Sequence, residues 1–566
     1  MRSLDPGFHR FNYFLRRGLG RLTAILAAAW LISPVCYAKG TDGGTNASSD
    51  AVSAPTDPVL NLLLEKGVIT EEEAAKTQAQ ADALRTNMAA QYAQENSKWK
   101  IGKDIKDLEL FGDLRLRYED REESDPTQGV PPDAKKKKPG IPAGKIDLYR
   151  FRYALRFGMR GDLFDDFYFG FRLETSSNPR STFVTMGTDS PDPYGKSALG
   201  IDVGQLYIGW DPASWFDFTV GRMPNPLFTS TMVWSPSINP EGLAEHLKAS
   251  VGNLDVYANL AQFLYQDENP IYASPNLGVN NNLLQSADNI FQVAWQAGFN
   301  YRITTNISAK VAATLYQYYG LKRSSTQNGG EAPYFGDSYI GEGAYTGPGS
   351  ANTINGYSGF GTSWTIPGFQ SSGYPNNQVG LDHLMVLEVP FEFNVRVHGL
   401  NFKAFGDFAY NLDGRARAEE AATGYAQYLK NQPVPSTIKA FKAQVNDVKA
   451  YQFGLAVGNK DSLGLVYGTT SKKNAWEIRA YWQHIEQYSL DPNLLDLDYN
   501  AGAENLQGFF TAFAYGFSDN TIGTVRFGEA ERINNKLGTG GTGTDIPDIN
   551  PIKSFELIQA DLTFKF

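Results

Sequence analysis

The sequence has only one cysteine, Cys36, among 566 residues, so no internal disulfide framework can stabilise it. It also lacks a basic excess: 51 Lys and Arg stand against 61 Asp and Glu, and the formal net charge is -10. A nucleic-acid-binding domain usually carries a basic surplus that neutralises phosphates, so no nucleic-acid partner is expected. No continuous apolar stretch reaches the roughly 18 residues of a membrane-spanning helix, which excludes helices as spans but leaves strands open.

Patterns for catalysis and metal binding are also missing. The four histidines after residue 38 lack the spacing of metal ligands: His246, His383, His398 and His484. No nucleophile signature of a hydrolase is found. The run GGTGTDI at 540–546 fits one calcium-binding β-roll repeat, a motif that needs tandem copies. We therefore expect no enzyme activity, no cofactor and no metal.

Aromatic residues, in contrast, are abundant, with 9 Trp, 30 Tyr and 35 Phe. That content argues against a disordered chain. The mean hydropathy of -0.35 suggests a soluble protein, and the length suggests about three or four ordinary domains. Both impressions depend on averages, whereas the order of the apolar residues along the chain indicates something different.

Residues 1–38 have the organisation of a cleavable signal peptide. Arginines, including Arg16, Arg17 and Arg21, precede the apolar run LTAILAAAWLI at 22–32. This run holds about 11 apolar residues where a spanning helix needs about 20. Cleavage after Ala38, which would remove Cys36, is expected, and an uncleaved anchor helix is the alternative.

The next segments are a flexible linker at 39–57, rich in Gly, Ser, Thr and Asp, and a helical segment at 58–100. Thr70 and Glu73 have the spacing of a capping box at the start of the longer helix. Residues from Ala74 to Gln91 repeat at spacings of three and four, as in a short coiled coil. This helix either oligomerises or tethers the protein to the cell wall, or it is a solvated amphipathic helix.

From about residue 105 to 566 the periodicity changes to two. In 148–160 aromatic and aliphatic residues such as Phe151 and Phe157 alternate with arginines such as Arg152 and Arg156. A soluble sandwich alternates with its apolar face in the core. A transmembrane barrel alternates with its apolar face on lipid.

Connection lengths separate these two folds. Sixteen strands are expected, at 107–118, 147–160, 167–175, 201–210, 215–222, 245–251, 254–264, 290–302, 305–318, 381–396, 399–411, 448–458, 475–489, 506–517, 521–532 and 555–566. Long connections follow the odd strands and mostly tight turns follow the even ones, as in an outer-membrane barrel. The segment 459–474 is too long for a tight turn. If the barrel has eighteen strands instead of sixteen, this segment contains the additional strand pair. The fold class is therefore an all-β transmembrane antiparallel barrel at 105–566.

The final strand keeps its alternation to its end, with Phe564 and Phe566 on the apolar face. A terminal aromatic on an amphipathic strand looks like the signal that outer-membrane proteins present to the barrel assembly machinery. We expect that machinery to be a partner of this chain.

Several segments resemble the putative porin family of diderm bacteria. They are LLEKGVITEEEA in the helical segment and, above all, GRMPNPLFTSTMVWSPSINPEG at 221–242. The resemblance covers essentially the whole chain after the signal peptide. It implies an outer-membrane barrel that passes small hydrophilic solutes, without indicating a particular substrate.

The polar parity of the first strands is expected to line an aqueous lumen, which a barrel of sixteen strands leaves open. The candidate pore-lining residues are Arg115, Arg117, Arg150, Arg152, Arg156, Arg160, Arg172, Glu109, Asp113 and Glu174. The arginines form a basic ladder that orients polar solutes, or they pair with acidic neighbours, Glu119 among them, and brace the wall.

The connection 223–244 is the candidate constriction loop, with Phe228, Met232, Trp234 and Glu241 as its residues of interest. Its three large apolar side chains would be costly to leave in water, and its prolines limit its freedom. The long aromatic connection 319–380 is a lid, a subunit contact or a place for sugars to stack. KKKK at 135–138 contacts lipid phosphates or is a solvated charge run.

Three functions follow from these patterns. The first is a porin for passive diffusion of small hydrophilic solutes or ions in the outer membrane, with lipid and lipopolysaccharide around it and the helical segment in the periplasm. The second is a channel selective for oxyanions or sugars. The third is a structural or adhesive protein with a plugged barrel. Whether the barrel is a monomer or a homotrimer is left open by the sequence.

Overall fold

The computed structural model describes residues 66, 70, 73, 76, 77, 105–124, 145–176, 181–187, 200–266, 290–319, 384–419, 442–460, 462–491, 494–496, 498, 504–534 and 553–566. The chain divides into two compact units, Met1–Lys100 and Ile101–Phe566. The second unit is one large antiparallel sheet.

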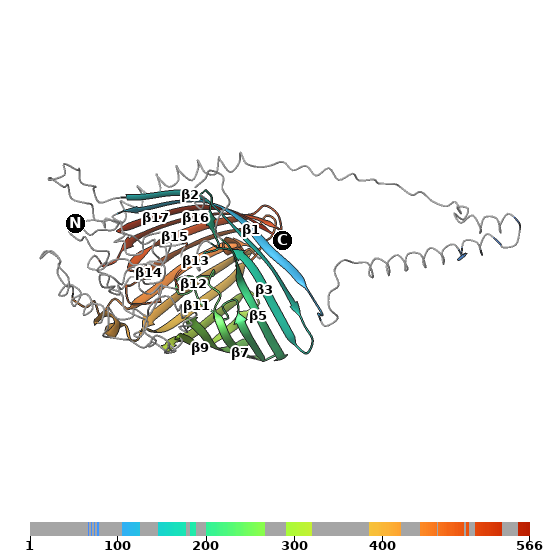
Figure 1. Ribbon diagram of the computed structural model, residues 1–566, viewed down its shortest axis with the longest axis horizontal. Coiled ribbons are helices and arrows are strands. Elements are labelled where there is room, and N and C mark those ends of the chain that lie inside the picture. The colour runs from blue at the N-terminus through green and yellow to red at the C-terminus, as the bar shows by residue number, and fades with distance from the viewer. Residues whose placement is uncertain are drawn as a thin grey trace, which may run out of the picture. The chain divides into compact units, whose positions relative to one another are not determined.

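Sixteen strands of the described residues form the wall of a closed barrel. Each pairs with its neighbour in sequence, and β1 pairs with β17 from Asp113↔Lys565 to Ser124↔Ser554. In Figure 1 the first strand, blue, lies near the last, red. The strands are β1 (Glu109–Ser124), β2 (Lys145–Asp162), β3 (Phe167–Thr175), β5 (Ile201–Ala213), β6 (Phe216–Arg222), β7 (Glu241–Val251), β8 (Leu254–Gln266), β9 (Ile290–Thr304), β10 (Ile307–Tyr319), β11 (Met385–Val397), β12 (Leu400–Asn411), β13 (Lys449–Asn459), β14 (Trp476–Ile485), β15 (Leu506–Gly516), β16 (Thr521–Arg532) and β17 (Ser554–Lys565).

The additional short strand β4 (Val184–Thr185) pairs with β2 at Tyr153 and Arg152. Because β3 pairs with β2 from Arg156 onward, β4 continues the line of β3 along the same neighbour.

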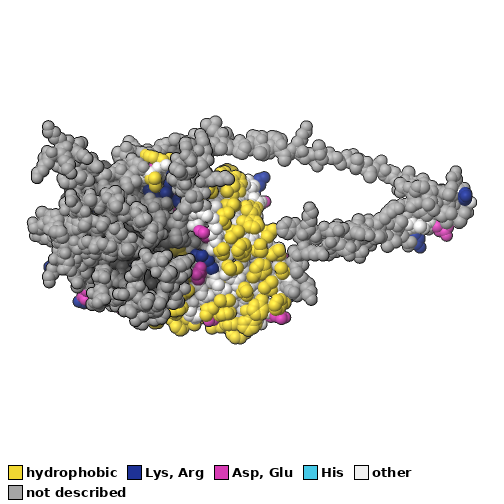
Figure 2. Space-filling view, viewed as in Figure 1, with side chains coloured by type: hydrophobic (Ala, Val, Ile, Leu, Met, Phe, Trp, Pro, Cys, Tyr) yellow, Lys and Arg dark blue, Asp and Glu magenta, His cyan; other side chains and the backbone are white. Residues whose placement is uncertain are grey.

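The period of two in the sequence puts apolar side chains outside the barrel. In β9, Trp295 is 52% exposed, whereas Gln296 beside it is 3% exposed. In β2 the corresponding pair is Phe151 and Arg152, at 62% and 2%. Figure 2 shows the outward hydrophobic side chains, yellow, gathered over the strands in view. The expected aromatic outer face and polar inner face are confirmed.

Tight turns and long connections alternate along the wall, as the sequence predicts. We call the end with turns such as 163–166, 252–253 and 398–399 the turn rim, and the opposite end the loop rim.

The expectation of sixteen strands is confirmed, and the eighteen-strand alternative is wrong. The long segment after β13 holds no strand pair among its described residues; it contains the 3₁₀ helix η3 (Leu465–Tyr467).

In the first unit, the capping box is confirmed. The backbone N–H of Thr70 donates to Oε2 of Glu73 at 3.0 Å, and the N–H of Glu73 donates to Oγ1 of Thr70 at 3.3 Å. Glu73 and Lys76 are helical. The signal peptide at 1–38, the linker at 39–57 and the rest of the helical segment lie outside the described residues, as do the lysine run at 135–138 and nearly all of 319–380.

Candidate solute pathway through the barrel

The interior face of β1 and β2 carries a ladder of charged side chains. The register pairs Asp113 with Arg156 and Arg117 with Arg152 across the two strands. Asp113 accepts hydrogen bonds from two guanidinium groups, from Nη2 of Arg156 at 2.6 Å and from Nε of Arg115 at 3.0 Å. Two cations therefore share one carboxylate on this part of the wall.

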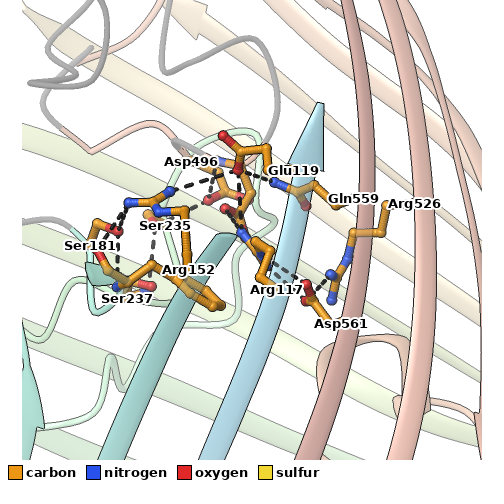
Figure 3. A network of polar contacts seen from close by, with 12 residues as sticks. Arg117, Glu119, Arg152, Ser181, Ser235, Ser237, Asp496, Arg526, Gln559 and Asp561 are labelled. Atoms are coloured by element: carbon orange, nitrogen blue, oxygen red, sulfur yellow. Dashed lines mark hydrogen bonds and ion pairs between the residues drawn. The ribbon is translucent and has the colours of Figure 1, made fainter. Parts of the chain in front are cut away.

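Arg117 lies deeper and is enclosed. Its Nε donates to Oδ1 of Asp561 on β17 at 2.7 Å, and its Nη1 donates to Oδ1 of Asp498 at 2.5 Å. Arg526 of β16 also binds Asp561, and the ring of Phe183 lies 3.8 Å from the Arg117 guanidinium carbon. Figure 3 shows how Arg117 and Arg526 converge on Asp561. Buried charges of this kind are stable only when each guanidinium group and each carboxylate has a partner of opposite charge.

Glu119, which is fully buried, is surrounded by arginines in the same way. Arg150 donates to its Oε1, while Arg121 and Arg152 approach to 3.4 and 3.7 Å. Gln559 of β17 donates to the other carboxylate oxygen at 3.0 Å. Several guanidinium groups again share one carboxylate.

The remaining predicted ladder residues form simpler pairs. Arg160 binds Glu109 at 2.6 Å near the turn rim, where both side chains are more than half exposed. Arg172 binds Glu174 at 2.8 Å. All seven predicted arginines therefore have acidic partners, so the expected pairing along the wall is confirmed. Their role in lining a solute path stays a prediction.

The connection between β6 and β7 contains a segment, 223–240, that we call the inward segment. Phe228 exchanges two hydrogen bonds with the side chain of Gln296 on β9, at 2.9 and 2.8 Å. Thr229 donates to Glu388 on β11 at 2.5 Å, and Ser230 donates to Asp407 on β12 at 2.6 Å. These wall residues belong to the buried, interior parity, so the inward segment lies inside the barrel.

Apolar packing holds the inward segment in place. Met232 and Trp234 are 1% and 4% exposed, and the Trp234 ring lies near those of Phe263 and Tyr316. Burying such side chains contributes about 1.5–3 kcal/mol each. Phe228 is less enclosed, and its ring lies 3.8 Å from Nζ of Lys310.

The fourth residue predicted for the constriction, Glu241, lies elsewhere. It starts β7 in the wall, where it faces Arg222 at 3.3 Å and both side chains are exposed. The sequence therefore placed three of its four constriction residues on the inward segment, and the fourth at its base.

Part of the connection from β14 to β15 packs against the inward segment. The N–H of Ser235 donates to the carbonyl of Leu494 at 2.6 Å, and Leu490, Leu494 and Leu495 share an apolar cluster with Trp234. Asp491 accepts hydrogen bonds from Tyr318 and Tyr265 at 2.6 and 3.3 Å. Figure 3 shows Asp496 beside Ser235. The loop rim thus contributes two segments to the interior.

A further segment enters from the turn rim. Glu477 accepts hydrogen bonds from the backbone N–H groups of Gly464 and Val466, at 2.8 and 3.1 Å. Arg526 donates to the carbonyl of Val466 at 2.9 Å, and Lys565 donates to that of Gly468 at 2.8 Å. This contact with β14, β16 and β17 explains the unusual length of the segment after β13.

Sequence reasoning missed several residues of the interior. Asp561 has the polar parity of its strand, which is a signal that could have been used. Asp498 lies in a connection without periodicity. Asp407 lies with Lys403 and Asn411 on the polar face that alternation indicates for 401–411, and Lys310 and Glu388 lie on the polar parity of β10 and β11.

The described residues contain no helix long and apolar enough to cross a membrane. They also contain no group of three or more His, Cys, Asp or Glu side chains arranged to hold a metal ion.

The path of the chain through the barrel is similar to that in solved porin structures, although the sequence identity is low. OmpT of Vibrio cholerae is 10% identical with a TM-score of 0.36, and the match covers 82% of this chain and 99% of that one. An anion-selective porin from Comamonas acidovorans is 10% identical with a TM-score of 0.35, covering 81% and 99%. A mutant of the Rh. blastica porin is 10% identical with a TM-score of 0.32, covering 81% and 100%. Comparison with curated proteins finds no match.

A closed antiparallel barrel of sixteen strands, apolar outside and polar inside, defines an outer-membrane porin channel. The chain belongs to the family described as "Putative porin", whose model matches residues 99–566. The family indicated by the sequence is therefore confirmed.

Proposed function

We propose that this porin conducts small hydrophilic solutes passively along a path narrowed by the inward segment. The observation that carries the proposal is the attachment of Phe228, Thr229 and Ser230 to β9, β11 and β12. Glu388 and Asp407 beneath the segment are fully buried, whereas Arg115 and Arg156 in the ladder keep some exposure. This difference supports a path between the inward segment and the ladder.

We further propose that the path favours anions. Arg115 and Arg156 share Asp113, and their side chains are 19% and 17% exposed. On the other side of the lumen Glu392 binds Lys403 at 2.9 Å and lies near Lys310, which has no ion pair of its own among the described residues. Both places leave a surplus of positive charge. Because guanidinium groups bind carboxylates and phosphates in a bidentate manner, a channel selective for oxyanions is the second candidate.

Conductance in planar bilayers tests the narrowing. Deleting 226–238 should raise single-channel conductance, while a deletion of equal length at 127–139, in another connection of the loop rim, should change it little. Unchanged conductance in the first variant would contradict the proposal. No channel in the parent protein would favour the plugged, structural alternative.

A salt gradient across the same bilayer tests the selectivity. The reversal potential should have the sign of anion preference, and Arg115→Gln with Arg156→Gln should reduce it. A concentration-dependent block by phosphate or a dicarboxylate would support the selective channel. Cation preference in the parent protein would contradict both the proposed anion preference and the proposed selectivity for oxyanions.

We also propose that residues 1–38 are removed on export and that 58–100 lies in the periplasm, where it contacts the cell wall. In this arrangement the loop rim faces outward among lipopolysaccharide, and the barrel assembly machinery recognises the strand that carries Phe564 and Phe566. Terminal sequencing of the membrane-inserted protein should start at Lys39, and a start at Met1 would contradict the cleavage.

A further inference from the structure

The carboxylate of Glu245 lies on the outer face of the barrel. In β7, Leu243 and Leu247 are 38% and 44% exposed, whereas Ala244 is 4% exposed. His246 contacts Asn259, which binds the inward segment at the carbonyl of Pro226. The side chains of Ala244 and His246 therefore face the interior, and Glu245 faces outward together with Leu243 and Leu247.

The neighbours of Glu245 on this outer face are apolar. The register pairs it with Phe218 on β6 and Leu260 on β8. Along its own strand, Leu243 lies toward the loop rim, and Leu247 and Val251 lie toward the turn rim. Glu245 thus stands within the apolar band, away from either end of its strand.

Glu245 accepts a hydrogen bond from another outward polar side chain. Nε2 of Gln262 on β8 donates to Oε2 of Glu245 at 3.1 Å. Among the described residues neither group has another hydrogen bond or ion pair. The second carboxylate oxygen, the second amide N–H and the amide oxygen therefore have no partner among the residues that the structure describes.

Lipid chains cannot supply that partner. The hydrocarbon region offers no hydrogen-bonding groups, and an ionisable side chain within it is expensive unless another polar group covers it. The outer faces of barrels are accordingly apolar, and charged substitutions there are destabilising. A polar pair in this position indicates a surface that another protein covers.

We propose that the outer face of β7 and β8 around Glu245 and Gln262 is the contact with a second copy of this chain. An acceptor and a donor lie side by side here on antiparallel strands. A two-fold axis between two such faces brings Gln262 of each copy against Glu245 of the other, so the pair complements itself. Ala249 and Ala258, on the same outward parity nearby, leave room for close approach.

The first test removes the polar pair. Glu245→Leu with Gln262→Leu should weaken self-association in mild detergent roughly tenfold, because two hydrogen bonds in an apolar medium are lost. Gln317→Leu, a change at another outward polar side chain on β10, is the matched control and should leave association unchanged. Heat-modifiable gel mobility and channel conductance should be normal in all variants, which shows that the barrel is folded.

The second test locates the contact by cross-linking. In a Cys36→Ser background, Leu260→Cys should form disulfide-linked dimers in membranes on mild oxidation. Leu455→Cys on β13, which is 68% exposed, should not. The proposal fails if the parent protein is monomeric, if both cysteines cross-link equally, or if Leu260→Cys captures a different polypeptide. Conductance is measured separately, so this failure is distinct from failure of the proposed channel.

Discussion

Arg117 joins parts of the chain that are far apart in sequence. Its guanidinium binds Asp561 on the last strand and Asp498 in the connection before β15, and its side chain is 1% exposed. Closing the barrel and folding a connection into it thus depend on the same cation. The pairing matters because an unpaired charge in this position would have neither water nor a counter-ion.

Replacing Arg117 should therefore be costly. Arg117→Leu leaves the buried carboxylate of Asp561 short of a partner, and breaking a buried pair costs about 3–5 kcal/mol. Arg160→Leu breaks an ion pair on the neighbouring strand that is more than half exposed, and should cost at most about 1 kcal/mol. Urea unfolding of the refolded protein in lipid vesicles measures both. Equal losses of stability would contradict this account of the interior.

For single residues, the sequence predicted which face of the barrel a side chain occupies better than it predicted which other side chain it binds. Alternation alone put Arg117 and Arg152 on the interior parity, since every second residue shares a face. It could not show that Asp561 would be the partner of Arg117, because that contact exists only once β1 and β17 meet. Asp498 was beyond reach for a different reason: no periodic pattern fixes the conformation of its connection.

Among the elements, the inward segment leaves and rejoins the wall at a pair of glycines. Gly221 and Gly242 face each other in the register of β6 and β7, with φ angles of 119° and 149°. A Cβ on Gly242 would lie 2.1 Å from the carbonyl oxygen of Gln262. Both the backbone conformation and the close approach of β8 require glycine here.

Gly242→Ala should consequently disturb the base of the inward segment. We expect a loss of more than about 2 kcal/mol, from a strained φ angle together with a clash against backbone. Gly252→Ala is the control: its φ is 61°, but nothing lies within 4 Å of the added Cβ, so the loss should be nearer 1 kcal/mol. The fraction of heat-modifiable protein after refolding across a urea series compares them, and a smaller loss at Gly242 would refute the close-approach argument.

The connection before β15 should be sensitive to pH. Burial, together with the negative charge of Asp498, raises the pKa of Asp496 to about 7. Arg117 and Arg526 act in the opposite direction. The folded connection therefore binds a proton more tightly than the released one between pH 3.8 and about 7, so its attachment weakens as the pH rises through that window.

Hydrogen exchange of the peptide 486–496 measures this attachment. After correction for intrinsic rates, protection should be greater at pH 5 than at pH 8, and Asp496→Asn should remove most of the difference. Asp202→Asn, a change at an exposed carboxylate on β5, is the control and should leave the difference in place. Greater protection at pH 8 in the parent protein would reverse the sign and overturn the argument.

Element boundaries were predictable where a strand is long and strictly alternating, as in β2 and β9. The turn after β13 was not. Its unusual length is evident from the sequence. The sequence could not show that Glu477 binds the backbone of Gly464 and Val466, because a side chain on a neighbouring strand stabilises that conformation. The lesson for porins is that an overlong turn can be an insertion into the lumen as well as a miscounted strand pair.

For the molecule as a whole, average composition suggested the wrong class of protein, whereas the order of apolar and polar residues along the chain indicated the right one. A mean hydropathy of -0.35 suggests a soluble protein because only alternate strand residues face lipid, while the interior and the connections are polar. The even number of strands and the alternation of connection lengths identified the closed barrel. Local sequence could not define the inward segment's contacts, because β9, β11 and β12 lie 50 or more residues away from it.

Closure of the barrel yields a last prediction, centred on Phe566. Its backbone exchanges two hydrogen bonds with Gly112 of β1, at 2.9 and 3.1 Å, and its ring stacks on Phe157 of β2 with centroids 6.4 Å apart. The ring also lies where a Cβ of Gly112 would be, 2.6 Å from its Cζ atom. Phe566→Ala removes the ring and keeps both backbone bonds, so the seam should still close.

The two roles proposed for Phe566 can be separated by where the protein folds. If the ring is read by the assembly machinery, Phe566→Ala should sharply reduce the heat-modifiable form in cell envelopes but refold almost normally in detergent, where no machinery is present. If the ring only packs the seam, both yields should fall together. Gly112→Leu pushes on the ring and on the carbonyl oxygen of Arg156, so it should impair folding in both settings. A normal yield of Phe566→Ala in cells would exclude the ring as an assembly signal.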